Sequence, residues 1–335
     1  AALAAPGGGE TQLLETCAAL QRIGVDAQFW RPWDDGFDHL DILHIFGSAP
    51  EHVEAIQLAK RRGVRTVVST IAWFSWAAAW GEARPWPARL FHVARHAVRA
   101  LAPGRPGWRQ AMYDAADVLL PNSQSEADQL MRYFRIPAKK IVVVPNGADE
   151  GFAEFTPYPD AEVAALGRFV LLPGRIEPRK NQLNVLRALA GSEIHAVVLG
   201  DPAPGAEAYA AECRDVRGAG TTFLPRIPHT DRRLKNLYAA ASALVLASWF
   251  ETPGLVALEA GMLGTPLVLP AAGSACEYFG DLAEYVRADD LKGIRAAVER
   301  AVAQPRDARL AEHVRRHFTW TQVAERTRIA YEQIL

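Results

Sequence analysis

The sequence is poor in cysteine and carries almost no net charge. Its 335 residues include three cysteines, Cys17, Cys213 and Cys276, which lie far apart and form no CxxC pair. This spacing argues against a zinc site or a disulfide framework and is typical of a reducing compartment. The 37 lysines and arginines nearly balance the 38 aspartates and glutamates, so the net charge of -1 indicates no particular partner.

Long apolar runs are absent as well. No stretch reaches the roughly 18 apolar residues that a membrane-spanning helix needs, and the N-terminal residues lack the charged and apolar segments of a signal peptide. We therefore expect a cytoplasmic protein. No nucleic-acid-binding motif is visible, so we expect no nucleic acid partner. What remains is an ordinary globular composition, half hydrophobic and 22% charged.

Short apolar runs alternate with helical patterns along the chain. In the first part, apolar runs predict strands at 26–30, 42–46, 66–69, 118–120 and 141–144, and amphipathic segments predict helices at 10–22, 51–62 and 125–133. Residues 1–5, before a proline and three glycines, are typical of a strand that ends in a glycine turn. After an aperiodic stretch, further strands are predicted at 169–172, 196–199, 222–224, 244–247 and 267–269.

The later strands are continuously apolar, which predicts sheets covered by helices on both faces. Two such βαβ arrays predict an α/β fold with two doubly wound, Rossmann-like domains facing each other across a cleft. We place an N-terminal domain at 1–150, a linker at 151–166 and a C-terminal domain at 167–317. The sequence leaves open whether the C-terminal helix, within 318–335, packs back on the first domain.

A basic loop follows the first strand of the second domain. Residues 173–181 place Arg175 and Lys180 beyond the carboxyl end of that strand. Two cations there suit a diphosphate, because they neutralise the charge of a leaving group without a metal. A solvated basic turn is the alternative interpretation.

A second loop, at 248–255, leads into a helix that contains Glu259. Pro253 suits the first helical position, and the following amides, from Gly254 and Leu255, would form an anion site at a helix N-terminus. Glu251 would face a sugar and Glu259 would accept from ribose hydroxyls. Each glutamate alone also fits an acid that complements the helix dipole.

Arg226 stands in a third loop, at 224–229, which also follows a strand. Backbone groups of such a loop could contact a base edge, although its two prolines favour a structural turn over base contact. A fourth loop, at 273–277, ends in Glu277, which is either part of the site or an ordinary early-helix acid.

Taken in order, these motifs resemble the GT4 family of retaining, GT-B fold glycosyltransferases. The resemblance covers nearly the whole chain and is most specific in the second domain. It is carried by Gly174-Arg175, Lys180-Asn181, Ser248, Glu251, Gly254-Leu255, Glu259-Ala260, Gly264-Thr265-Pro266 and 277–281, with a looser match at 145–149 and at Gly8-Gly9-Glu10.

The resemblance implies a role for each of these residues. Arg175 and Lys180 would hold the diphosphate, Glu259 the ribose, and Glu251 the donor sugar or the reacting face. The amides of Gly254 and Leu255 would bind phosphate or sugar, and Gly8 or Gly9 would approach the phosphate from the first domain. The resemblance also implies retention of anomeric configuration, no metal, and no cofactor beyond the nucleotide-sugar co-substrate.

The chain departs from the family pattern at two places. Thr252 and Pro253 stand where glycine and phenylalanine are frequent, and the stretch 69–73 lacks the histidine that often follows the equivalent strand. We assign no substitute for that histidine. We interpret His44, which lies in a predicted strand, as a hydrogen-bonded core residue rather than a catalytic one.

Residues 83–110 contain six arginines and no acid, at positions 84, 89, 95, 99, 105 and 109. Arg89, Arg95 and Arg99 recur at helical spacing, and tryptophans, Trp73 among them, lie in or near this stretch. The pattern suits a basic amphipathic helix on an anionic membrane, which would make the protein peripheral on the inner membrane face. It also suits a site for an anionic lipid-linked or saccharide acceptor, and a solvated helix with core tryptophans remains the third interpretation.

The hypothesis from sequence is a retaining transferase that moves a sugar from a nucleotide-diphosphate donor to a saccharide or lipid-linked acceptor in cell-surface polysaccharide or glycoconjugate synthesis. A GT-B nucleotide-sugar epimerase is the enzymatic alternative. A non-catalytic nucleotide-sugar-binding subunit is the other. Base, sugar, acceptor and linkage are not specified by the sequence.

Overall fold

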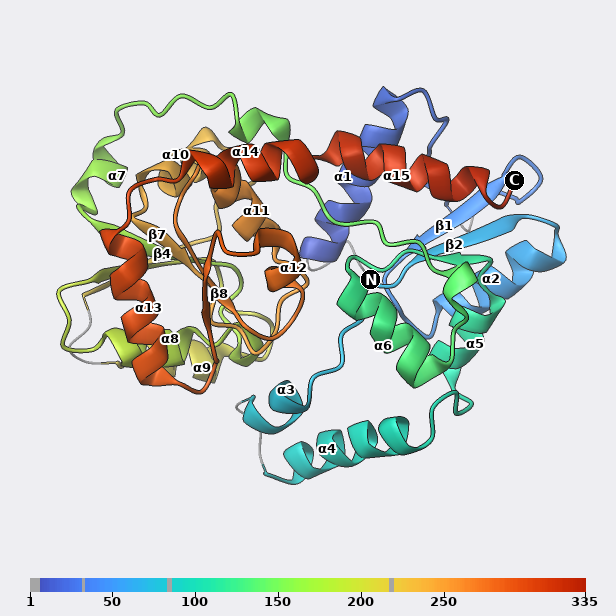
Figure 1. Ribbon diagram of the computed structural model, residues 1–335, viewed down its shortest axis with the longest axis horizontal. Coiled ribbons are helices and arrows are strands. Elements are labelled where there is room, and N and C mark those ends of the chain that lie inside the picture. The colour runs from blue at the N-terminus through green and yellow to red at the C-terminus, as the bar shows by residue number, and fades with distance from the viewer. Residues whose placement is uncertain (1–6, 32–33, 83–85, 217–219) are drawn as a thin grey trace. The chain divides into compact units, whose positions relative to one another are not determined.

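The computed structural model describes residues 7–31, 34–82, 86–216 and 220–335 (Figure 1). The chain forms two compact units. The first comprises Ala1–Phe74, Ala94–Gly147 and Phe318–Leu335, and the second comprises Ser75–Val93 and Ala148–His317. Each unit has its own parallel sheet, as the predicted α/β class requires.

The sheet of the first unit has three parallel strands in the order β1-β2-β3. The strands are β1 (Ile42–Phe46), β2 (Arg65–Ser69) and β3 (Val118–Leu119), and the helices are α1 (Gly8–Arg22), α2 (His52–Arg61), α5 (Trp108–Ala115), α6 (Gln124–Phe134) and α15 (Trp320–Glu332). Tyr113, Leu119 and Phe134 form the centre of one core cluster, where α5 and α6 cover the sheet. The short 3-10 helix η2 (Ala138–Lys140) follows α6.

Two strands predicted in this unit are wrong. Residues 26–30 form no strand and pair with none of the described strands. Phe29 is 52% exposed, while Trp30 packs against a small core cluster that contains Phe37 and Leu43. Residues 141–144 run beside β3 without forming a regular strand: Ile141 makes an isolated parallel bridge to Leu119, and the amides of Val142 and Val144 donate to the carbonyls of Leu119 and Pro121, each at 3.0 Å. The strand predicted at residues 1–5 lies outside the described residues.

The glycines near the N-terminus belong to a helix rather than to a turn before it. Gly7 caps α1, and its carbonyl accepts hydrogen bonds from the amides of Glu10 (3.0 Å) and Thr11 (3.1 Å). Gly8 and Gly9 therefore form the first turn of α1. A Cβ on Gly9 would lie 3.5 Å from Cδ1 of Ile71, so this turn runs close to the segment that follows β2.

A buried glutamate holds the segment after β2. The carboxylate of Glu126 on α6 accepts hydrogen bonds from the Thr70 hydroxyl (2.5 Å), the Ala72 amide (2.6 Å) and the Asn122 amide (2.8 Å). Between the first two, Ile71 has a φ of 43°, which a β-branched residue rarely adopts. Tertiary hydrogen bonds thus stabilise an unfavourable backbone conformation directly beyond the sheet edge.

The second unit contains six parallel strands in the order β6-β5-β4-β7-β8-β9. They are β4 (Phe169–Pro173), β5 (His195–Leu199), β6 (Thr221–Leu224), β7 (Ala243–Val245), β8 (Leu267–Pro270) and β9 (Glu284–Val286), of which β9 was not predicted. The order reverses between β4 and β7, and ligands of doubly wound sheets bind beyond the carboxyl ends of the strands at such a switch point.

Helices cover both faces of this sheet (Figure 1). They are α8 (Gln182–Leu189), α9 (Glu207–Arg214), α10 (Arg232–Ala240), α11 (Leu255–Met262), α12 (Ala275–Phe279), α13 (Leu291–Ala303) and α14 (Ala308–His317). One core cluster of this unit lies between helices α8 and α13 and the sheet. It contains Val185 and Leu186 of α8, Val198 of β5 and Val298 of α13. The continuously apolar strands are therefore explained by burial on both faces.

The units do not follow the boundaries that we predicted. The predicted linker at 151–166 belongs to the second unit. It contains α7 (Ala161–Ala165) and lies next to η3 (Glu150–Phe152), and the Asn236 amide on α10 donates to the Tyr158 carbonyl at 3.1 Å. The segment Ser75–Val93, predicted in the first domain, also belongs there. It carries α3 (Trp76–Gly81) and the beginning of α4 (Trp86–Leu101).

His44 connects the C-terminal helix to the first sheet. Its Nδ1 lies 2.7 Å from the Tyr331 hydroxyl on α15, and its Nε2 lies 3.0 Å from the Ser69 hydroxyl. Helix α15 packs along α1 in the same unit (Figure 1). Both ring nitrogens have partners, as expected for a core histidine. Burial lowers the pKa of His44 to about 3.

This lowered pKa predicts a loss of stability in acid. An unfolded histidine has a pKa of about 6.5 and binds a proton below it, whereas the native ring stays neutral down to about pH 3. Unfolding therefore takes up a proton in this window, and the free energy of unfolding should fall by about 1–2 kcal/mol between about pH 7 and about pH 5. Denaturant titrations of the wild type and of His44→Gln at both pH values measure the effect. Equal pH dependence in the two proteins would contradict the assignment.

Candidate functional site

Three loops meet beyond the carboxyl ends of β4, β7 and β8. The Trp249 amide donates to the Arg179 carbonyl (2.9 Å), which joins the loops after β7 and β4. The Ser274 amide donates to the Glu251 carbonyl (2.9 Å), which joins the loops after β8 and β7. Gly273 permits this approach, because a Cβ there would lie 2.0 Å from the Glu251 carbonyl oxygen.

Asn181 fixes the end of the first of these loops. It adopts a left-handed conformation with a φ of 60°, which asparagine tolerates better than most residues. Its side-chain amide donates to the carbonyls of Ala247 and Ala288, each at 2.8 Å. The loop that carries Lys180 is thereby tied to the loop that carries Glu251.

The two charged residues predicted for these loops form a buried ion pair. Lys180 Nζ donates to Glu251 Oε1 at 2.6 Å, and the Ser248 hydroxyl donates to the same oxygen at 2.6 Å. Glu251 is 5% exposed. Burial alone would raise the pKa of Glu251, but the Lys180 and Arg179 charges and the hydrogen bonds from Lys180 and Ser248 hold it below its ordinary value. Glu251 is therefore an ionised carboxylate rather than a proton donor at neutral pH.

Arg179 is a residue of this site that the sequence reasoning did not single out. Its Nη1 lies 3.8 Å from Glu251 Oε1, its Nη2 donates to Glu177 Oε1 at 2.9 Å, and its guanidinium lies over the Phe250 ring. In the sequence, the one feature that pointed to Arg179 as a site residue was its position next to Lys180 in the basic loop. Arg175 lies exposed on the same loop, and the contacts described here do not bring its side chain to Glu251.

Helix α11 begins at Leu255, with Gly254 as its N-cap. The expectation that Pro253 occupies the first helical position is wrong, since the helix begins two residues later. Gly254 has a φ of 87°, and a Cβ would lie 3.2 Å from Leu246 Cδ1 and 3.4 Å from Glu251 Oε2. The N-terminus of α11 therefore lies close to the Glu251 carboxylate. The first backbone amides of the helix, which have no partner within the helix, are near the Lys180–Glu251 ion pair.

Glu259 is buried in the second turn of α11 and already has partners. Its Oε1 lies 2.9 Å from Nε2 of His229. The Tyr238 hydroxyl also bonds to it, and burial followed by the Glu259 charge raises the pKa of Tyr238 well above its ordinary value. His229 was considered only as part of a loop, and nothing in its local sequence marked it as a partner of Glu259. Arg226, in the same loop, is exposed, and its amide donates to Asp201 Oδ1 at 3.3 Å.

A helix from the first half of the chain covers the second loop. Ala78 of α3 packs against Trp249 and Ala288, with Phe250 at the edge of this cluster. Gly81, at the end of α3, lies flat on the Trp249 indole, since a Cβ there would come within 2.0 Å of the ring. Because Gly81 and Trp249 lie well over a hundred residues apart in the chain, this contact could not be predicted from the sequence.

The remaining candidates, of which Arg89 belongs to the second unit and the others to the first, lie in different places. Arg95 and Arg99 line one pocket, whereas Trp73 and Arg89 are not among its lining residues. Gly8 and Gly9 lie in α1, near Ile71 rather than near that pocket. No helix in the described ranges is long and apolar enough to cross a membrane.

These features define a class of protein. A six-stranded parallel sheet in Rossmann order, in a chain that contains a second parallel α/β unit, is the arrangement of the GT-B glycosyltransferase fold. Known structures show the same fold. Sucrose-phosphate synthase from Thermosynechococcus elongatus matches 98% of this chain and 94% of its own, with a TM-score of 0.69 and 18% identity. The Anabaena protein HepE, solved with UDP and glucose, matches 98% and 97%, with a TM-score of 0.67 and 16% identity.

Family models identify the chain more closely. Residues 6–152 match the model "Glycosyltransferase Family 4", and residues 163–317 match "Glycosyl transferases group 1". The chain belongs to this family of glycosyltransferases. A D-inositol 3-phosphate glycosyltransferase from Mycolicibacterium vanbaalenii is 31% identical over 290 residues, which are 71% of this chain and 63% of that protein. The chain thus spans somewhat less than two thirds of the length of that relative.

The buried ion pair predicts strong energetic coupling. Removing either charge from the Lys180–Glu251 pair leaves the other buried without its partner, so Lys180→Met and Glu251→Gln should each lower the free energy of unfolding by about 3 kcal/mol. The double variant should cost clearly less than the sum of the two. Urea titrations of the four proteins measure the coupling. Additive effects would show that the two charges do not interact in solution.

Proposed function

We propose that this protein is a retaining glycosyltransferase that uses a nucleotide-diphosphate sugar. The observation that carries the proposal is the Lys180–Glu251–Ser248 cluster, which lies beside the start of α11 at the switch point of the sheet. The family to which the chain belongs supports the same reaction class.

The cluster suits the cleavage of a glycosyl–phosphate bond. Negative charge grows on the leaving diphosphate as this bond breaks, and Lys180 together with the amides at the start of α11 would stabilise that charge. Exposed Arg175 on the same loop would add a cation from the solvent side. Because Glu251 is ionised, its role is to orient Lys180 and accept from sugar hydroxyls rather than to donate a proton.

Glu259 and its partners would bind the ribose of the donor. A carboxylate accepts hydrogen bonds from paired hydroxyls, and the contacts from His229 and Tyr238 fix its position in the protein. Arg226 would lie toward the base. In this proposal the donor needs no metal, since the cations of the first loop supply the positive charge. The acceptor hydroxyl attacks the anomeric carbon from the face that the diphosphate leaves, the glycosyl–phosphate bond breaks, and the hydroxyl proton passes to an oxygen of the leaving diphosphate.

The first donor to test is a UDP-sugar, because the Anabaena protein HepE has been solved with UDP-glucose. GDP- and ADP-sugars complete the panel. A thermal-shift screen ranks them, since a ligand that binds only the native state raises the apparent stability. The acceptor panel should pair saccharides and lipid-linked saccharides of cell-surface polymers with D-inositol 3-phosphate, the substrate in the names of relatives.

The site assignment predicts loss of transfer in two variants. Lys180→Ala removes the cation that stabilises the leaving diphosphate, and Glu251→Ala removes the carboxylate that positions it, so each should lower the turnover at least about 100-fold. Transfer of labelled sugar, measured with EDTA present, gives the rate. Lys292→Ala and Glu299→Ala on α13 are matched controls that should keep full activity.

Full activity in both site variants would refute the assignment.

A parallel incubation of the donor without an acceptor distinguishes the transferase from the two alternative functions. An isomerised donor would indicate an epimerase, while donor binding with no conversion of any acceptor would indicate a non-catalytic subunit.

We also propose that α4 places this cytoplasmic enzyme on an anionic membrane surface. The helix has no buried residue, and its exposed apolar side chains are Trp86, Leu90, Phe91, Val98 and Leu101. Arginines on the same helix would contact lipid phosphates while these side chains enter the interface.

Vesicle binding tests this placement. The wild type should co-sediment with phosphatidylglycerol vesicles at low salt and should be released as salt rises, because the attraction is partly electrostatic. Leu90→Ser with Phe91→Ser should weaken binding severalfold, whereas Leu58→Ser, an exposed position on α2, should not. A wild-type protein that stays in the supernatant at low salt would exclude the membrane role.

A further inference from the structure

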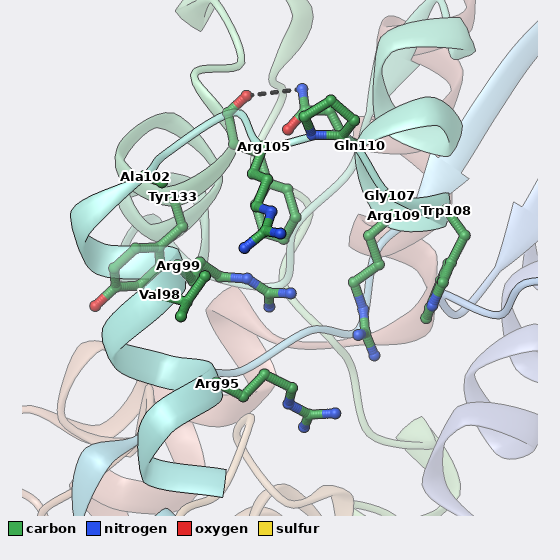
Figure 2. Close-up of a pocket in the computed structure, with 12 residues that line it drawn as sticks. Arg95, Val98, Arg99, Ala102, Arg105, Gly107, Trp108, Arg109, Gln110 and Tyr133 are labelled. Carbon is green, nitrogen blue, oxygen red and sulfur yellow. Dashed lines mark hydrogen bonds between the residues drawn. The ribbon is translucent and has the colours of Figure 1, made fainter. Parts of the chain in front are cut away.

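The first unit contains a pocket whose wall is strongly cationic (Figure 2). It has a volume of about 230 Å³ and is formed by the last turns of α4, the loop after it, the start of α5 and the end of α6. Four of the twelve lining residues are arginines, at positions 95, 99, 105 and 109, and none of the twelve is an acid. The side chains of Arg95, Arg99, Arg105 and Arg109 project into the same space in Figure 2.

Two of these arginines are held by aromatic rings rather than by acids. The Arg99 guanidinium lies 4.4 Å from the centre of the Phe74 ring and 4.9 Å from that of Phe134. The Arg109 guanidinium lies 4.1 Å from the centre of the Trp108 ring. Ring faces orient a guanidinium without neutralising it, so both arginines present fixed, uncompensated charge to the pocket.

Three of the pocket arginines, Arg99, Arg105 and Arg109, have no acidic partner in the described part of the chain. Burial, and then the charges of Arg109 and Arg95, lower the pKa of Arg99. Burial also lowers the pKa of Arg109. Nε of Arg109 is buried and has no hydrogen-bond partner among the described residues, and Arg99, Arg105 and Arg109 form no ion pair within the described ranges. Gathering such groups costs free energy that an anionic ligand would recover.

We propose that this pocket binds a phosphate group. Arginine forks match the geometry of phosphate oxygens, and a phosphate carries enough charge and enough acceptors to engage several guanidinium groups at once. The volume is below that of sites for whole drug-sized molecules, so the pocket suits a phosphate with a small part of its substituent. The phosphate belongs either to a soluble phosphorylated compound or to a lipid headgroup, and exposed Val98 at the rim is compatible with both.

This pocket lies in the first unit, its lining includes none of the residues assigned to the donor, and the proposal does not rest on the proposed glycosyl transfer. The test therefore measures binding rather than turnover. Inorganic phosphate and pyrophosphate are titrated calorimetrically into the full chain. Because both probes could also occupy the donor loops, the titrations are done in the Lys180→Ala background as well.

The variant to test is Arg99→Gln with Arg109→Gln, and the matched control is Arg65→Gln, an exposed arginine on β2 that does not line the pocket. The pocket variant should weaken binding of the soluble probes roughly tenfold or more, in both backgrounds, and the control should not. Circular dichroism checks the fold of each variant. If the pocket variant does not fold, Arg105→Gln serves instead, since Arg105 is exposed and holds no core contact in the described structure.

A second arm distinguishes the source of the phosphate. Vesicles of phosphatidylcholine with and without phosphatidylglycerol are presented to the same proteins. Loss of soluble-probe binding in the pocket variant assigns a soluble phosphorylated ligand, and loss confined to anionic vesicles assigns a lipid headgroup. Either supports the site. Equal binding by the pocket variant and Arg65→Gln in both arms, or no binding of any probe by the wild type, would overturn it.

Discussion

The ion pair between Lys180 and Glu251 is the interaction on which the candidate site depends. It joins the loop after β4 to the loop after β7, the two strands between which the sheet order reverses. A buried pair of this kind contributes little net stability compared with an apolar contact, but either charge alone would be costly. Its presence at the switch point therefore fits the proposed donor site better than a purely structural role, and it keeps a carboxylate ionised beside the start of a helix.

The backbone around the pair is equally constrained. A Cβ on Gly273 would collide with the Glu251 carbonyl, and Gly254 adopts a positive φ in a tight space beside Leu246. The Asn181 side chain donates to two carbonyls from other loops. The site is consequently assembled by close backbone contacts rather than by long flexible side chains. Such a construction fixes the positions of charge before a ligand arrives, which is the requirement for electrostatic stabilisation of a leaving group.

The partners of the buried charged side chains differ between the two units. In the second unit, Glu251 and Glu259 each have a nearby cation or hydrogen-bond donor. In the first unit, Arg99 and Arg109 are partly buried against Phe74, Phe134 and Trp108, with aromatic faces in place of acids. The first arrangement is complete in the protein alone. The second is electrostatically incomplete, and for that reason it indicates a ligand.

The sequence by itself determined the parallel α/β class, most strands of the second unit and the pairing of a basic loop with a glycine-led helix, because apolar runs and loop motifs are local signals. It could not show that residues 26–30 lack a sheet neighbour, that residues 75–93 belong with the second unit, or that His229 meets Glu259. These facts arise from contacts between residues far apart in the chain. The same limit applies to the arginines: their number and spacing were visible in the sequence, but only the tertiary structure gathered four of them around one pocket.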